Sequence, residues 1–379
     1  MAGHVLVTGG TGYIGSHTVV LLVEAGYRVT IVDSLCNSSA GALSRIAAIT
    51  GKPDAVTFVQ LDLRDRAGVT ALFAATPFDG VIHFAALKAV GESRAKPLLY
   101  YDNNLGGTLV LLQAMADAGC KTLVFSSSCT VYGDGVPPLS EDSPTGLTTN
   151  AYASSKLITE QMLADVCRCD PTWRVCILRY FNPVGAHPSG LIGEDPRGVP
   201  NCLMPYVLQV LVGRLEKLTV FGKDYATRDG TAIRDYIHVV DVARGHLDAL
   251  AWMRKQLEAA KAAGGATGLL EYFNFGTGTG STVLELVAAL EKASGKKVPM
   301  VIGPARAGDV PAAYANIEKV RRASAAPLTH SGELTHTNTP FSAGGPRAGL
   351  APAQHHRRLR EGRMELAEQK PARVRGVGE

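Results

Sequence analysis

The chain has 379 residues, 46% of them hydrophobic and 19% charged. This composition can bury a large core and excludes a disordered chain, a coiled coil and a disulfide-stapled miniprotein. The net charge of +4 is uneven: residues 321–379 hold nine Arg and one Lys against five Glu, whereas residues 1–320 hold 28 basic and 29 acidic residues. The body of the chain therefore gives no electrostatic reason to expect a nucleic acid or an anionic membrane as partner.

The seven cysteines are scattered and form no C-x-x-C pair. This pattern favours reduced thiols in the cytoplasm over a disulfide framework or a metal site. The first predicted strand begins at about Val5, which leaves no room for a signal peptide. No apolar run reaches the roughly 18 residues that a membrane span needs. We therefore expect a cytoplasmic protein that binds neither a metal ion nor a membrane.

Short apolar strands alternate with amphipathic helices through the first 180 residues. Strands are predicted over 4–8, 28–33, 57–61, 80–84, 122–126 and 174–179, and helices over 14–25, 105–118 and 152–167. This alternation predicts an α/β fold, a doubly wound parallel Rossmann sheet. After about Asn182 Pro and Gly become frequent, which indicates a smaller C-terminal substrate-binding domain.

The predicted domains are a nucleotide-binding domain over 1–180, with a return segment near 234–245, and a substrate domain over 181–320. Residues 321–379 are expected to form an atypical basic tail without stable structure, because Pro327–Ala353 is rich in Thr, Ser, Gly and Pro.

Three glycines follow the first strand at regular spacing, Gly9, Gly12 and Gly15, and a helix follows them. Glycine is needed where a turn is tight and where the backbone must approach a pyrophosphate. The N-terminus of the helix offers N–H groups to the phosphates. Asp33 ends the second strand, where a carboxylate can hold a ribose 2′-hydroxyl and would repel a 2′-phosphate. The sequence therefore predicts an NAD site rather than an NADP site.

Tyr152 and Lys156 form a Y-x-x-x-K pair on a predicted helix, so their side chains share one face. An ammonium group beside a phenol favours the phenolate, which can then act as a base. The preceding strand ends in Ser126-Ser127-Ser128, and the Ser128 hydroxyl could orient or relay a substrate proton. We take Ser128, Tyr152 and Lys156 as the candidate catalytic residues.

Several longer strings extend this pattern. The chain contains VLVTGGTGYIGSH from Val5, VIHFAALKAVGES from Val81, FSSSCTVYG from Phe125, RYFNPVGAHPSG from Arg179 and RDYIH from Arg234. Over about residues 3–319 the chain resembles the UDP-glucose 4-epimerases, which are extended short-chain dehydrogenases/reductases. The resemblance implies an isomerase, expected to be homodimeric, that oxidises the sugar at carbon 4 with bound NAD, lets the 4-keto sugar turn over and reduces it on the other face. The substrates implied are UDP-galactose and UDP-glucose.

The resemblance also implies which residues line the two ligands. For NAD it implies Gly9, Gly12, Tyr13, Ile14, Gly15, Asp33, Asn37, Ser38, Asp62, Leu63, Phe84, Ala85, Lys88, Asn103, Ser128, Tyr152, Lys156 and Tyr180. For the UDP-sugar it implies Lys88, Ser128, Tyr152, Phe181, Asn182, Leu203, Thr219, Phe221, Arg234, Arg306, Asp309 and Ala313. Arginines suit a diphosphate because the guanidinium fork matches phosphate oxygens.

The chain departs from the family pattern at four places. Cys202 replaces an expected Asn, Ala307 an expected Glu, and Ala313 a bulky Tyr that some bacterial members carry. The small Ala313 leaves room for an N-acetyl group, so UDP-N-acetylglucosamine and UDP-N-acetylgalactosamine are further candidate substrates. Beyond Lys319 the family continues with helices that this sequence lacks. A shifted reading frame, a disordered extension and a functional basic tail all remain open explanations.

Two alternative functions are considered. A nucleotide-sugar 4,6-dehydratase would share the Tyr/Lys pair, but it needs an Asp-Glu pair after Thr130, where this chain has Val131-Tyr132. An NAD-binding pseudoenzyme, impaired by the aberrant C-terminus, is the alternative from another class. The intact set of Ser128, Tyr152 and Lys156 argues against it.

Overall fold

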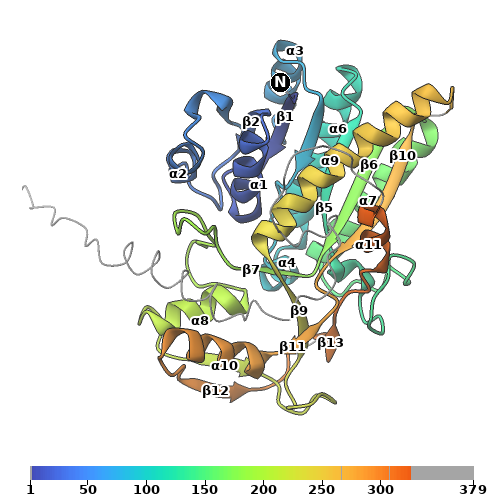
Figure 1. Ribbon diagram of the computed structural model, residues 1–379. Helices are drawn as coiled ribbons and strands as arrows, with labels where there is room; N and C mark the ends of the chain where they lie inside the picture. The colour runs from blue at the N-terminus through green and yellow to red at the C-terminus, as the bar shows by residue number, and fades with distance from the viewer. Residues whose placement is uncertain (1, 266, 307, 326–379) are drawn as a thin grey trace, which may run out of the picture.

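The computed structural model describes residues 2–265, 267–306 and 308–325 (Figure 1). A sheet of seven parallel strands forms the centre of the molecule, as the alternating pattern predicted. In spatial order its strands are β10 (Leu269–Phe275), β6 (Arg174–Tyr180), β5 (Thr122–Ser128), β4 (Gly80–His83), β1 (His4–Thr8), β2 (Arg28–Asp33) and β3 (Val56–Gln60). The doubly wound Rossmann fold is confirmed.

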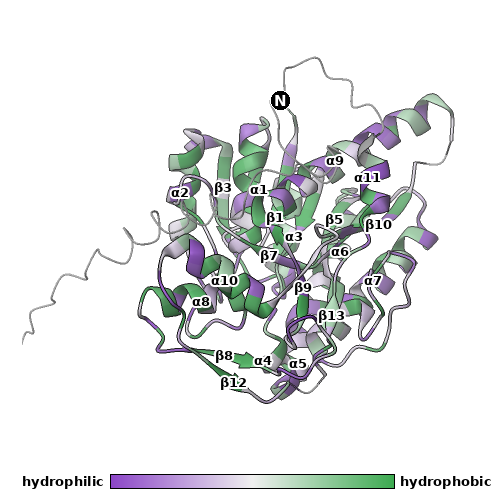
Figure 2. Ribbon diagram, turned by 60° about the horizontal axis from the view of Figure 1, so that its bottom comes forward, coloured by the Kyte–Doolittle hydropathy of each residue, from purple (hydrophilic) through white to green (hydrophobic). Residues whose placement is uncertain are grey.

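Helices cover both faces of this sheet, so its strands are apolar throughout. One face carries α1 (Tyr13–Glu24), α2 (Gly41–Thr50) and α9 (Val239–Ala262), and the other carries α3 (Arg66–Ala75), α6 (Gly107–Asp117) and α7 (Ala151–Cys169). Strand β1 shows why, because alternate residues point to opposite faces. Val5 and Val7 pack in the apolar cluster under α1, α2 and α9, which we call the first core. Leu6 packs in the cluster under α3, α6 and α7, the second core. Figure 2 shows the apolar colour concentrated on the strands and on the helix faces turned toward them.

Shorter elements connect the large ones. They are the 3₁₀ turns Pro53–Ala55 and Cys129–Tyr132, helices α4 (Val90–Ala95) and α5 (Pro97–Tyr100), and a π-helical turn, Tyr101–Gly106. The π-helical turn runs directly into α6. The first two residues of the helix predicted over 105–118, Leu105 and Gly106, therefore belong to the π-helical turn and not to the α-helix. Such turns often mark functional sites.

Helix α6 corrects an expectation about self-association. From their spacing in the sequence, Leu109, Leu112 and Met115 are candidates to face a partner subunit across a two-fold axis, and covering the sheet explains the same spacing equally well. Only Leu109 is exposed, at 53%, whereas Leu112 and Met115 are 5% and 0% exposed and pack in the core beneath the sheet. Their apolar spacing reflects burial against the strands.

The smaller part of the molecule lies below the large sheet in Figure 1. It contains a four-stranded sheet, a two-stranded sheet and two helices. Their bounds are β7 (Asn182–Val184), β9 (Ile233–His238), β11 (Gly280–Thr282) and β13 (Ala312–Ala313) for the first sheet, β8 (Leu218–Phe221) and β12 (Met300–Gly303) for the second, and α8 (Leu203–Leu211) and α10 (Val283–Ser294) for the helices. A separate apolar cluster joins α8 and α10 to β8.

The chain returns to the large sheet over a longer segment than predicted. The return was expected near 234–245, but β9 (233–238) pairs in the four-stranded sheet, whereas α9 (Val239–Ala262) covers a face of the large sheet and β10 joins that sheet as a strand. The missed part is β10, which pairs in parallel with β6. The predicted domain boundary at residue 180 therefore does not separate the residues of the two sheets, because β10 of the large sheet lies beyond it. The assignment of 181–320 to substrate binding stays a prediction.

The last described element is α11 (Glu318–Ala325). The tail was predicted to start at 321, but α11 continues to Ala325, and Ala323 packs partly buried against the apolar cluster that contains Val320. Regular packing therefore continues past the predicted start. The expectation of disorder for the rest of the tail concerns residues outside the described ones. Among the described helices, none is both long and apolar enough to cross a bilayer.

Candidate functional site

Several predicted residues meet at one edge of the large sheet because parallel strands all end there. Thr8, His83, Ser128 and Tyr180 are the last residues of β1, β4, β5 and β6. In open α/β folds ligands bind outside this carboxyl edge. The Thr8 hydroxyl and the His83 ring join two of the strand ends at 2.7 Å.

The glycine loop has the geometry of a phosphate cradle. Gly9 adopts φ +70°, and a Cβ there would lie 2.8 Å from the Ala85 amide nitrogen. A Cβ on Gly15 would overlap the Gly9 carbonyl oxygen, so helix α1 can approach the loop only with glycine at this position. Among the described residues, no side chain caps the first turn of α1 and no acidic residue lies in it. The helix N-terminus therefore presents a positive dipole end that suits a pyrophosphate.

Asp33 is held in place by the loops around it. It is 6% exposed, and its carboxylate accepts hydrogen bonds from the Thr11 and Leu35 amides, at 3.2 and 2.9 Å, and from the Ser38 hydroxyl at 2.8 Å. A carboxylate has about four acceptor sites, so one remains for a ribose hydroxyl. The cradle and this oriented carboxylate fit a dinucleotide.

The three candidate catalytic residues lie together on β5 and α7. Ser128 accepts hydrogen bonds from the Thr130 amide and hydroxyl, at 3.2 and 3.0 Å. The Ser128 hydroxyl also hydrogen-bonds Tyr152, and this bond acts to lower the pKa of Tyr152. Burial acts more strongly in the opposite direction, so the net pKa of Tyr152 is raised. In this structure Tyr152 is a phenol ready to share a proton with Ser128.

Lys156 lies one helical turn beyond Tyr152. It is 5% exposed, its Nζ donates to the Ser126 carbonyl at 2.6 Å, and it sits 4.9 Å from the centre of the Phe125 ring. Burial lowers the pKa of Lys156 to about 7, against the raising effect of Glu160.

Lys88 supplies a second cation, and among the cations it is the one with the largest lowering effect on the pKa of Tyr152. It forms an ion pair with Glu194 at 2.9 Å. Burial lowers the pKa of Lys88, and the charges of Glu194 and Cys202 more than compensate, so the pKa is raised. Its side chain is nevertheless 55% exposed.

The predicted sugar-nucleotide residues come mainly from the smaller part. Arg234 on β9 forms an ion pair with Asp309, and Ala313 on β13 pairs in register with Arg234. The Arg306 guanidinium stacks 4.0 Å above the Phe221 ring. Asn182 donates to the Asp235 carbonyl at 3.1 Å, Phe181 is buried beside Ala313, and Leu203 and Thr219 lie on α8 and β8.

These two groups of residues meet around Tyr152. The charge of Cys202 raises the pKa of Tyr152, and Arg306 in turn acts on the pKa of Cys202. Burial raises the pKa of Cys129 to about 12, and Arg234 opposes the shift. Packing joins the two groups of residues: Phe181 and Ala313 lie in one apolar cluster with Val131, Tyr132 and Leu157, which brings β13 and its neighbour β9 against α7 and the turn that follows Ser128.

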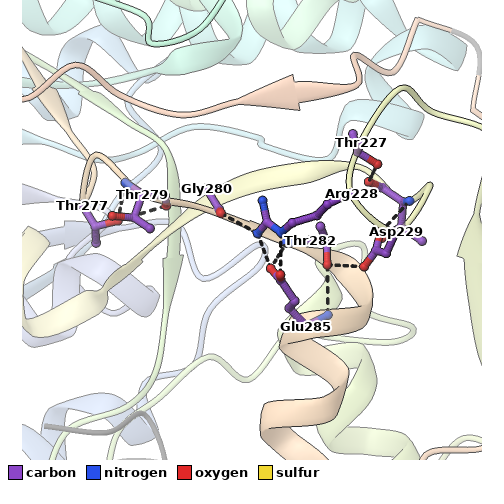
Figure 3. A network of polar contacts seen from close by, with 9 residues as sticks. Thr227, Arg228, Asp229, Thr277, Thr279, Gly280, Thr282 and Glu285 are labelled. Atoms are coloured by element: carbon purple, nitrogen blue, oxygen red, sulfur yellow. Dashed lines mark hydrogen bonds and ion pairs between the residues drawn. The ribbon is translucent and has the colours of Figure 1, made fainter. Parts of the chain in front are cut away.

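A polar network fixes the segment between Phe221 and Arg234 (Figure 3). Arg228 forms an ion pair with Glu285 and also donates to the Gly280 carbonyl at 2.9 Å. Asp229 accepts from Thr282 at 2.5 Å, and Thr282 also caps α10. The network ties this segment to the first turn of α10, and it thereby sets the position of both predicted ligand contacts.

A loop between β7 and α8 crosses back to the nucleotide side. Gly185 accepts a hydrogen bond from the Tyr13 hydroxyl at 2.8 Å, and Arg197 donates to the Ser38 carbonyl at 2.6 Å. Glu194 of the same loop pairs with Lys88. Three residues predicted to line the cofactor are thus in contact with one loop of the smaller part.

The other predicted cofactor residues are distributed around the same edge. Asp62 pairs with Arg64, which lowers the pKa of Asp62, and Tyr180 hydrogen-bonds the His246 ring. The remaining ones are Ile14 at the start of α1, Asn37 in the exposed loop after β2, Leu63 in the core, Phe84 and Ala85 just after β4, and Asn103 in the π-helical turn.

Sequence reasoning missed two positioning residues. Asn150 caps α7 by accepting from the Ala153 amide at 2.9 Å, which fixes where Tyr152 emerges. Asn immediately before a helical pattern is a recognisable start signal. Asn104 bonds both the Leu87 backbone and the Ser155 hydroxyl, and no local sequence signal indicates that pairing.

Fold and site together define a dinucleotide-dependent enzyme of the short-chain dehydrogenase/reductase type that acts on nucleotide sugars. The model of the "NAD dependent epimerase/dehydratase family" matches residues 5–260. Relatives include UDP-glucose 4-epimerase 2 of Arabidopsis thaliana, 56% identical over 85% of this chain and 89% of its own length, and UDP-glucose 4-epimerase of Bacillus subtilis, 54% identical over 84% and 90%. The chain belongs to this NAD-dependent family, and within it to the UDP-glucose 4-epimerases.

Solved structures agree. The Bifidobacterium longum UDP-glucose 4-epimerase in complex with NAD⁺ and UDP has 51% identity and a TM-score of 0.76, and the match covers 83% of this chain and 90% of that one. The Stenotrophomonas maltophila enzyme, with NAD and formylated UDP-arabinopyranose, has 43% identity and a TM-score of 0.83, covering 96% and 99%. The dehydratase and pseudoenzyme alternatives are not favoured. Val131 and Tyr132, where a dehydratase needs its acidic pair, are buried in an apolar cluster.

Proposed function

We propose that this protein interconverts UDP-galactose and UDP-glucose by oxidation and re-reduction at carbon 4 of the sugar. The observation that carries the proposal is the position of Tyr152, which shares a hydrogen bond with Ser128 at the carboxyl edge of the large sheet and lies on α7, whose Leu157 packs in one apolar cluster with Ala313 of the smaller part. A phenol between a dinucleotide cradle and a diphosphate-binding pair is the arrangement that this reaction needs. Relatives more than 50% identical are UDP-glucose 4-epimerases, which supports the same reaction.

The residues take the following roles. Tyr152, assisted by Ser128, removes the proton from the 4-hydroxyl and later returns it. NAD, which these residues would hold, would supply reversible hydride transfer at carbon 4 of the sugar. Lys156 holds the nicotinamide ribose and favours the phenolate of Tyr152, and Lys88 adds a second positive charge near the phenol. Gly9, Gly15 and Asp33 hold the dinucleotide.

Arg234 and Arg306 bind the diphosphate, and Asp309 orients Arg234 through the ion pair between them. Because these contacts hold only the nucleotide, the 4-keto sugar is free to turn over. Ala313 lies beside Arg234 and leaves room for an N-acetyl group, so N-acetylated UDP-sugars are proposed as further substrates. A solved relative at 31% identity is a UDP-Glc/GlcNAc 4-epimerase from Campylobacter jejuni.

The active form is proposed to be a cytoplasmic homodimer. Leu98 and Leu109, on α5 and α6, are 80% and 53% exposed, and two such side chains support a partner at this face. All seven cysteines are free thiols, in keeping with a reducing compartment. Light scattering on the wild-type chain and on Leu109→Glu tests the dimer: the substitution should convert dimer to monomer, and a monomeric wild-type chain would refute it.

The test of the reaction uses purified full-length protein, UDP-galactose and a coupled dehydrogenase that reports UDP-glucose. We expect turnover without added NAD, and loss of turnover in Tyr152→Phe with UDP binding retained. A wild-type chain that binds NAD and UDP but shows no turnover would contradict the proposal and support the pseudoenzyme.

A further inference from the structure

A buried ion pair lies directly behind the candidate catalytic residues and takes no part in the roles given above. Arg179, at the end of β6, and Glu160, on α7, have side chains only 6% and 3% exposed. The guanidinium donates through Nε and Nη2 to the two carboxylate oxygens, at 3.1 and 2.7 Å. Breaking a buried pair by removing one partner is costly because the other charge is left unpaired.

The pair is locked by further contacts. Arg179 also donates to the Tyr132 hydroxyl at 3.0 Å and to the Glu141 carbonyl at 3.2 Å. Its guanidinium lies between the Tyr132 and Tyr272 rings, 4.9 and 4.8 Å from their centres. These contacts hold the Arg179 guanidinium in place, and its two bonds to Glu160 orient that carboxylate.

Glu160 in turn acts on both elements that carry the catalytic residues. Its Oε1 accepts from the Ser127 hydroxyl at 2.5 Å, and Ser127 is the residue before Ser128 on β5. On the other side of Ser127, Ser126 accepts from Lys156 of α7 at 2.6 Å. Two successive residues of β5 are therefore bonded to α7 immediately before Ser128, which sets the register of Ser128 against Tyr152.

Glu160 also lies one helical turn beyond Lys156, on the same face of α7. Its carboxylate is the charge that favours the protonated form of Lys156. The other titratable groups near Lys156 are Tyr152, one turn back on the same face of α7, and His83 on β4, whose pKa burial lowers to about 3 and whose ring is bonded to Thr8 and Thr108. Strand β5 contributes only the uncharged Phe125 ring and Ser126 carbonyl.

We propose that Ser127, Glu160 and Arg179 form a positioning network for the reaction, in which Glu160 holds Ser128 in register with Tyr152 and keeps Lys156 charged. The inference rests on the proposed function for its catalytic consequence. The effect on Lys156 is a property of this chain alone and can be measured without turnover.

The first variant is Ser127→Ala, which removes the bond from β5 to Glu160 and leaves the ion pair intact. Thr159→Val is the matched control, because Thr159 is a buried hydroxyl next to Glu160 whose bond goes to its own helix, to the Ser155 carbonyl at 2.9 Å. We expect kcat to fall about tenfold in Ser127→Ala with KM within about twofold, as for a transition-state effect worth ~1.4 kcal/mol. The control should keep the wild-type kcat. Wild-type kcat in Ser127→Ala would overturn the positioning role.

The second variant is Glu160→Gln, which keeps the shape and removes the charge. NMR titration of lysine labelled with ¹³C at Cε, with Lys156 assigned from Lys156→Met, reports the ionisation of Lys156 directly. We expect the Lys156 midpoint to fall by about one pH unit or more in Glu160→Gln and to stay in place in Ser127→Ala. An unchanged midpoint in Glu160→Gln would overturn the charge role. Should Glu160→Gln fail to fold, Glu160→Asp, which retains the charge, should keep the wild-type midpoint, and a midpoint lowered there would count against the proposal.

Discussion

Replacing Gly15 with alanine tests the phosphate cradle most directly. A Cβ at this position would overlap the Gly9 carbonyl oxygen and lie 2.9 Å from the Gly10 Cα. Both are backbone atoms and cannot rotate away. The Gly9 carbonyl is also fixed by the Gly12 amide, which donates to it at 3.1 Å. Helix α1 must therefore move away from the loop or the loop must open.

The expected cost follows from the packing of α1, which has eight buried residues. Overpacking a well-packed core costs roughly 1–3 kcal/mol. For a chain of this size that corresponds to a fall in Tm of roughly 2–6 °C. Because the displaced atoms form the cradle, the amount of NAD bound per chain should fall well below the amount bound by the wild-type protein. NAD released on denaturation and the Tm of the NAD-free protein measure the two effects separately.

Gly12→Ala is the matched control within the same loop. A Cβ at Gly12 would lie 3.2 Å from the same Gly9 oxygen, a contact that a small shift relieves, and its φ of −75° suits alanine. The NAD-free Gly12→Ala protein should therefore keep a Tm close to the wild-type value. Equal destabilisation by the two substitutions would refute the steric reasoning.

Three further changes have defined expected results. Burial raises the pKa of Asp248 to about 6, so the charge of Asp248 disfavours the folded state above that pH. Asp248→Asn should therefore raise the free energy of unfolding by roughly 1–2 kcal/mol at pH 8 but not at pH 4. Equal gains at both pH values in denaturant titrations would count against this. Arg306→Ala should weaken the binding of UDP, measured by calorimetry, at least about tenfold, and should leave Tm unchanged because Arg306 is exposed. An unaltered affinity for UDP would show that Arg306 is not part of the site. Ala313→Tyr should reduce turnover of UDP-N-acetylgalactosamine relative to UDP-galactose, and an unchanged ratio of kcat/KM values would exclude the steric argument.

The large sheet could be read from the sequence because its signals are local. Strand β1 has the predicted bounds, and the glycine spacing that follows it forms the turn whose chemistry it indicated. Tyr152 and Lys156 lie on one helix as predicted, since a four-residue spacing fixes a shared face wherever the helix packs.

Contacts between distant segments were not accessible in this way. Lys88 and Tyr152 are 64 positions apart, and the effect of one on the other follows from the order of strands β4 and β5 rather than from any motif. Strand β10, with the sequence LLEYFNF, was missed because it follows an irregular stretch. Nothing in its local sequence indicates that it pairs with β6. The apolar face of α6 suggested a partner subunit, since burial within a chain and burial between chains produce the same periodicity.

The position of β10 has a consequence for synthesis of the chain. The large sheet takes its outermost strand from residues 269–275, after β7, α8, β8 and β9 of the smaller part have been made. While the ribosome is still translating that part, β6 has an exposed edge whose central residues are destined to be fully buried. Such an edge is a site of wrong pairing. Nascent chains that stop before Phe275 should therefore depend on chaperones far more than chains released just after it.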